Sequence, residues 1–139
     1  MRSETVATLG RWIFGLFYAT TGLAIAAFVL LGIGSPPTQP TPAAAAFASA
    51  LSASGIIDPL LAASYLAGGL ALLWRRTAPL GILLLAPAVV VIFCFHLHLS
   101  GQWIWGSANL LWLAALAVHY RSAFTPLWSA TWGQKMGSE

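Results

Sequence analysis

Four long apolar stretches of this chain contain no Lys or Arg, and all six of its Lys and Arg residues lie outside them. The stretches cover residues 12–34, 56–74, 79–99 and 103–120. A helix needs roughly 20 mostly apolar residues to cross the hydrocarbon core of a bilayer. Each stretch meets this requirement, so the sequence predicts four membrane crossings.

The six cationic residues fall on one side of such a four-pass arrangement. They lie before the first stretch, between the second and third, and after the fourth, at Arg2, Arg11, Arg75, Arg76, Arg121 and Lys135. Short loops rich in Lys and Arg stay on the cytoplasmic side of a membrane. We therefore expect a multi-pass protein of a bacterial-type cytoplasmic (inner) membrane with both termini cytoplasmic, and with Arg11, Arg75, Arg76 and Arg121 as topology anchors.

The composition supports this class of protein. Charged residues make up 6% and hydrophobic residues 59% of the 139-residue chain, whereas soluble domains contain about 25% charged residues. The predicted fold is a single all-α domain, a four-helix transmembrane bundle. Prolines end the first stretch, and an Ala-rich run over 43–53 predicts a short interfacial helix in the first outer loop. The tail, 121–139, is expected at the cytoplasmic surface.

The formal charge of +3 does not indicate a nucleic-acid partner. The cations are scattered singly or as one pair, so they form no basic face that could follow a phosphate backbone. Membrane lipids are the expected partners.

A signal peptide is the other interpretation of residues 12–34, but this run is longer than the 7–15 apolar residues typical of such a segment, which favours an uncleaved span. The single cysteine, Cys94, cannot form an internal disulfide and is expected to be a packing residue.

Small residues recur on one face of the first stretch, at Gly15, Ala19 and Gly22. Such faces let helix backbones approach closely in lipid, and Gly68 and Gly69 are expected to do the same in the second stretch. Packing within the bundle is the favoured use of the first face; contact with a partner subunit is the alternative.

A few polar residues lie within or beside the predicted outer half of the bundle, and each needs a physical reason to be there. They are Asp58, Tyr65, His96 and Asn109, and Trp103 could form an aromatic wall. One hypothesis is a site for a quinone or another lipid-like ligand. The alternative is a structural cluster, in which Asp58 and His96 bond to one another or to the backbone.

Metal and haem sites are not expected. His96 and His119 lie near opposite membrane faces, and His96 and His98 are two residues apart on one helix, so no pair converges on one ion. No nucleophile–base set, phosphate loop or paired carboxylates is present either. The sequence therefore favours a non-catalytic role, with no intrinsic cofactor, over an enzyme.

An ordered set of short motifs resembles the DoxX-like family of small four-span membrane proteins. The motifs are Phe47-x-x-x-Leu51-x-x-Ser54-Gly55, Asp58-Pro59-Leu60-Leu61, Gly68-Gly69-Leu70, Ala78-Pro79-Leu80, Ile92-Phe93-Cys94-Phe95-His96 and Tyr120-Arg121-Ser122-Ala123-Phe124. The resemblance implies a four-helix membrane fold and a link to membrane redox or assembly complexes. The chain departs from the family pattern at Tyr65, where many members have Glu, and at Val91, where they have Asn.

Two functions follow as expectations. The first is a non-catalytic accessory or assembly subunit of a larger membrane complex, in contact with other membrane protein subunits. The second is the membrane subunit of a quinone-linked oxidoreductase, with quinone as its ligand near the outer leaflet.

The charge pattern makes a topology prediction. With Cys94 replaced by Ser, a cysteine introduced at Arg75 should react with an impermeant thiol reagent only after the cytoplasmic side is opened. A cysteine placed in the loop over 35–55 should react in intact cells and is the matched control. Labelling of position 75 from the outside would contradict the four-pass arrangement.

Overall fold

The structure, a computed structural model, describes residues 2–35 and 37–128, and every regular element in these ranges is helical. The helices in chain order are α1 (Arg2–Leu31), α2 (Pro42–Ala53), α3 (Ile57–Leu73), α4 (Ala78–Phe95), the π-helical turn η1 (His96–Ser100), α5 (Trp103–His119) and α6 (Arg121–Trp128). The prediction of an all-α fold is confirmed.

The prediction of four crossings is met in part. Two segments are long and apolar enough to cross a membrane, Glu4–Leu31 and Ala78–Ser100. A third is available if α2 and α3, which meet at a bend of 93°, count as one broken span. Both α3 and α5 are apolar but have only 17 residues each. The described chain therefore has two or three helices that could span a membrane.

Local sequence explains where the helices begin. Thr41 caps α2, because its hydroxyl accepts a hydrogen bond from the Ala44 N–H at 3.1 Å, and Pro42 follows at the first helical position. Asp58 lies in the first turn of α3, where the helix dipole favours an acidic side chain. The chain leaves η1 through Gly101 at φ 71°, a left-handed conformation that glycine adopts readily.

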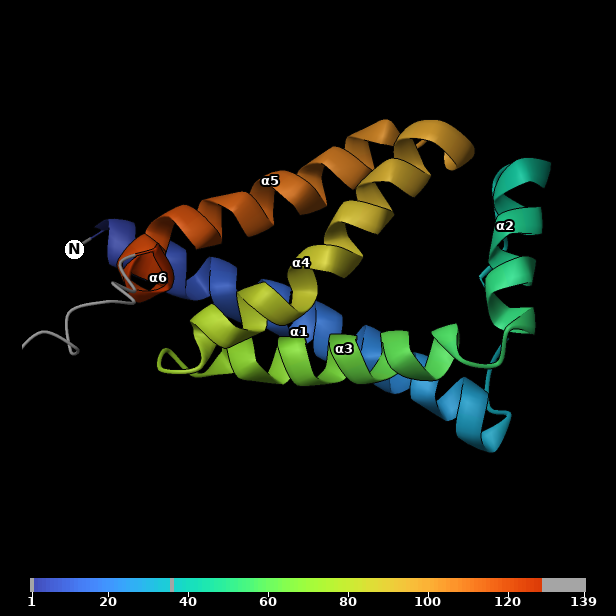
Figure 1. Ribbon diagram of the computed structural model, residues 1–139, viewed down its shortest axis with the longest axis horizontal. Helices are drawn as coiled ribbons and strands as arrows, with labels where there is room; N and C mark the ends of the chain where they lie inside the picture. The colour runs from blue at the N-terminus through green and yellow to red at the C-terminus, as the bar shows by residue number, and fades with distance from the viewer. Residues whose placement is uncertain (1, 36, 129–139) are drawn as a thin grey trace, which may run out of the picture.

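The long helices form an antiparallel arrangement with two distinct ends (Figure 1). α1 and α3 lie side by side, α4 packs on α3, and α5 returns along α4 as a hairpin. α2 lies at the far right of the view, across the end of the other helices, where the Phe47 ring packs on the Phe95 ring at the end of α4 with centroids 5.8 Å apart. The start of α1, the α3–α4 turn and α6 share the opposite end, which we call the basic end, where Glu4 and Arg75 form an exposed ion pair of 3.7 Å.

Glycines set how closely α1 approaches α3. A Cβ placed on Gly22 would lie 2.6 Å from the backbone nitrogen of Leu66, and one placed on Gly69 would lie 2.7 Å from the carbonyl oxygen of Gly15. Ala19 is buried in the same contact. Gly68 allows a similarly close approach of α4 to α3, since a Cβ there would lie 2.6 Å from Cγ of Leu85 in α4. The two adjacent glycines thus let α3 pack closely on both sides.

Two side chains lie where the sequence did not place them. Arg11, expected to meet lipid headgroups, is only 5% exposed and donates from Nη1 to the carbonyl oxygen of Leu72, near the end of α3. This contact partly satisfies a helix C-terminus that attracts cations. Cys94, expected to pack inside, is exposed.

Helix boundaries also differ from the predicted spans. α1 begins at Arg2, well before the predicted start of the first crossing, and the last part of the third crossing is the π-helical η1. α4 continues through Pro87, and Figure 1 shows it changing direction partway along, as an internal proline commonly causes. Residues 121–128 of the tail form the unpredicted helix α6, whereas 129–139, including Lys135, lie outside the described residues.

The close α1–α3 contact at Gly69 predicts that a Gly→Ala substitution there lowers the free energy of unfolding, whereas the same change in an ordinary helix interior raises it. Gly→Ala in a helix interior normally stabilises by up to about 1 kcal/mol. Gly69→Ala should instead destabilise the protein, by about 1–3 kcal/mol, because the new methyl group meets the backbone of α1. Thermal unfolding in detergent measures this effect.

Gly10→Ala is the matched control. The nearest atom to a Cβ at Gly10 is Nε1 of Trp112 at 3.4 Å, so this variant should be neutral or slightly stabilised. Equal stability of the two variants would contradict the close α1–α3 approach.

Candidate functional site

The structure brings together two of the predicted site residues around a third residue that the sequence did not single out. The hydroxyl of Tyr18, in α1, donates to Oδ1 of Asn109, in α5, at 3.1 Å. The ring of Tyr65, in α3, meets the ring of Tyr18 edge to face with centroids 5.0 Å apart. All three side chains are buried. We call this group the tyrosine–asparagine cluster.

The cluster is closed by its own hydrogen bonds. Asn109 uses its Nδ2 group to donate to the carbonyl oxygen of Trp105 at 3.0 Å, one turn earlier in α5. Its amide oxygen is taken by Tyr18. The amide is therefore engaged on both its donor and acceptor sides, which is the usual state of a buried polar group.

Aromatic rings surround the cluster and bridge α1 to α5. Phe14 lies 4.8 Å from the Tyr18 ring and 5.6 Å from Trp112, and Phe17 lies 5.9 Å from Trp105, all between ring centroids. These rings fill the space between two helices whose backbones scarcely meet. Tyr18 could have been anticipated, because it lies beside Ala19 on the inward side of the first helix.

His96 is engaged locally and does not join the cluster. Its Nδ1 lies 2.7 Å from the hydroxyl oxygen of Ser100, at the other end of η1. The Ser100 oxygen also accepts the backbone N–H of Gln102 at 3.3 Å. His96 packs on α5 where Gly106 leaves room, since a Cβ on that glycine would lie 2.8 Å from Cβ of His96. His96 therefore helps to shape the η1–α5 turn.

Asp58 lies apart from His96. The proposed structural pairing between these two side chains is not present, and within the described part of the chain the Asp58 carboxylate forms no hydrogen bond or ion pair. Asp58 is half-buried in the first turn of α3. Of the five predicted ligand residues, Tyr65 and Asn109 thus share the tyrosine–asparagine cluster, whereas Asp58, His96 and Trp103 lie outside it.

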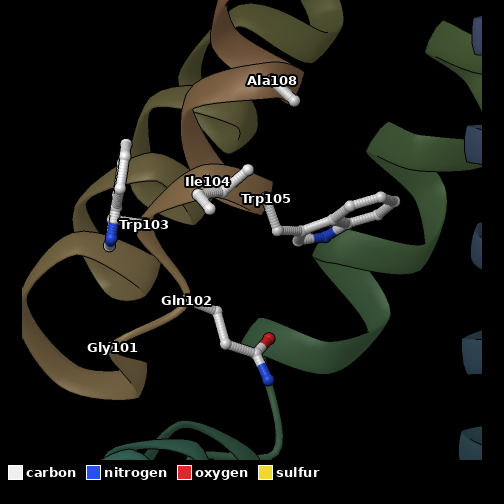
Figure 2. A pocket seen from close by; sticks show the side chains of 6 residues that line it. All are labelled: Gly101, Gln102, Trp103, Ile104, Trp105 and Ala108. Atoms are coloured by element: carbon white, nitrogen blue, oxygen red, sulfur yellow. The ribbon is translucent and has the colours of Figure 1, made fainter.

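Trp103 lines a hollow at the start of α5 (Figure 2), which lies at the opposite end of the helices from the basic end (Figure 1). The hollow has a volume of about 440 Å³ and is lined by Gly101, Gln102, Trp103, Ile104, Trp105 and Ala108. Figure 2 shows the amide of Gln102 and the indole of Trp105 reaching across its open side towards α3. The lining is almost entirely apolar, with a few polar groups at its edge, which suits an amphiphilic molecule.

The described residues contain no group of three or more His, Cys, Asp and Glu side chains that could hold an ion.

Comparison with protein-family models, with curated proteins and with solved structures finds no match for this chain. The resemblance to DoxX-like proteins therefore rests on the sequence motifs.

The hydrogen bond from Tyr18 predicts a measurable stability effect. Tyr18→Phe leaves the Oδ1 atom of buried Asn109 without its partner and should destabilise the protein by about 1 kcal/mol. Unfolding of the purified protein in detergent measures the change.

Tyr65→Phe is the control, because within the described residues the Tyr65 hydroxyl forms no hydrogen bond while its ring packs against the same partner. It should change stability less than Tyr18→Phe. The reverse order would show that the α1–α5 hydrogen bond contributes little.

Proposed function

We propose that this chain is a DoxX-like, four-span protein of a bacterial-type inner membrane, and that it serves as a non-catalytic accessory or assembly subunit of a larger membrane complex. The observation that carries the proposal is the apolar outer surface of its long helices. Large hydrophobic side chains that are about half or more exposed occur along α1, α4 and α5, among them Leu16, Leu23, Val90, Val91, Leu111 and Val118. Soluble monomers rarely expose contiguous apolar surface on this scale.

The positions of the cations support the proposed orientation. Arg75 pairs with Glu4, Arg76 follows in the same α3–α4 turn, and Arg121 begins α6, all at the basic end. Under the rule that short cationic loops remain inside, the basic end is cytoplasmic. α2 and the hollow then lie at the outer face.

The two short helices are compatible with crossing. Seventeen residues at 1.5 Å each span about 26 Å, slightly less than a hydrocarbon core of about 30 Å. Local thinning of the bilayer and flanking tryptophans accommodate such a mismatch. Trp74 follows α3, and Trp103 begins α5, both well exposed.

The engagement of the internal polar groups supports an accessory role. Tyr18 donates to Asn109, Asn109 donates to the backbone carbonyl of Trp105, and His96 is bonded to Ser100. These groups hold helices and turns together. The surface that remains for interaction is the apolar exterior, which can contact lipids and the helices of other subunits.

Isolation from native membranes in mild detergent tests this proposal. The chain should migrate well above its own mass plus micelle, with other membrane subunits in fixed stoichiometry that persists through a second separation. A monodisperse monomer without partners, obtained under conditions that keep known membrane complexes intact, would overturn it.

The hollow favours one alternative function. A membrane subunit of a quinone-linked oxidoreductase needs a site for a lipid-like ligand at headgroup depth, and the hollow with Trp103 at its edge offers one. Saturable binding of a short-chain benzoquinone to the purified protein is the minimum that this alternative requires.

A further inference from the structure

We infer that the hollow at the start of α5 binds the carbonyl group of an uncharged amphiphile, with the side-chain amide of Gln102 and the indole N–H of Trp105 as the hydrogen-bond donors. The inference deepens the quinone-type alternative above and rests on the proposed membrane orientation for the depth of the site. It moves the polar ligand contacts from His96, Asp58 and Tyr65 to Gln102 and Trp105, which the sequence did not predict as hydrogen-bond donors.

The first step is the availability of the two donors. Within the described residues, neither the amide of Gln102 nor the indole nitrogen of Trp105 forms a hydrogen bond. Both residues line the hollow, and Figure 2 shows both side chains directed across its open side. A few polar groups at the edge of an apolar pocket fix the orientation of a ligand, and these two donors can do so for a ligand that carries a hydrogen-bond acceptor.

The second step is the rigidity of the turn that carries them. The backbone N–H of Gln102 donates to the hydroxyl oxygen of Ser100. The backbone carbonyl oxygen of Gln102 accepts a hydrogen bond from the backbone N–H of Trp105 at 3.0 Å. Ser100 is in turn held by His96 at 2.7 Å. With the backbone engaged in this way, the two side chains are presented from a fixed frame, which lowers the entropy lost on binding.

The third step is the chemistry of the ligand. The lining contains no charged side chain, and the cations of the described chain lie elsewhere, with Arg75 and Arg121 at the basic end. An anionic headgroup would therefore find no partner in this hollow. An uncharged carbonyl joined to an apolar body fits the donors and the walls, and about 440 Å³ holds a substituted ring or the ester region of a lipid.

Calorimetric titration of the full chain in detergent tests the inference. The probes are a benzoquinone bearing one isoprenoid unit and a short-chain diacylglycerol, which share the carbonyl chemistry but represent a redox ligand and a structural lipid. Tighter binding of the first identifies a quinone-type site, and tighter binding of the second identifies a lipid site. Saturable binding of either supports the inference, and saturable binding of neither overturns it.

Single substitutions assign the donors. Gln102→Leu and Trp105→Phe, which keep much of the side-chain volume, should each weaken binding about fivefold or more, as expected for one lost hydrogen bond. The matched controls are Gln39→Leu and Trp74→Phe, which do not line the hollow and should leave affinity unchanged. Unchanged affinity in both hollow variants would overturn the assignment.

His96→Ala separates this site from the one expected from sequence. If His96 were the donor, its removal would weaken binding more than either hollow substitution, and the inference would be wrong. Because the titration uses the isolated chain, its outcome does not depend on whether a partner subunit exists. Failure of the accessory-subunit proposal and failure of this site are therefore distinguishable.

Discussion

The close approach of α1 and α3 governs the rest of this structure. Gly15, Gly22 and Gly69 remove the side chains that would separate the two backbones, and no larger residue fits at Gly22 or Gly69 without a shift of the neighbouring helix. Between apolar helices in lipid, packing and hydrogen bonds provide the association energy that burial from water provides elsewhere. The register of this contact sets Arg11 beside the end of α3 and Tyr18 beside Tyr65.

A second consequence concerns α5, which touches α1 through side chains more than through backbone. With Tyr18 held against α3, its hydroxyl reaches Asn109 and ties α1 to α5 across the interior. Phe14 and Trp112 fill the remaining space. The result is a set of helices whose polar interior groups serve cohesion, while the outward surface stays apolar.

The distinction between engaged and free polar groups changes the candidate site. Asn109 and His96 drew attention in the sequence because polar groups inside a membrane protein need a reason. In the structure each is bonded to a neighbour, which supplies that reason. Gln102 and Trp105 were not predicted as donors from the sequence, since a glutamine in a turn and a tryptophan at a helix end are common. Both line the hollow, and among the described residues neither the Gln102 amide nor the Trp105 indole nitrogen forms a hydrogen bond.

The sequence by itself determined the helical class, the apolar stretches and, to within one residue, the starts of α2, α3, α4 and α5, because composition and proline geometry act locally. Only the tertiary structure decided the π-helical η1, the 93° bend between α2 and α3, the burial of Arg11 and the partners of Tyr18 and His96. These features depend on which helix faces which at what rotation. The pairing and rotation of the helices are set by contacts between residues far apart in the chain, and local sequence preferences do not encode these contacts.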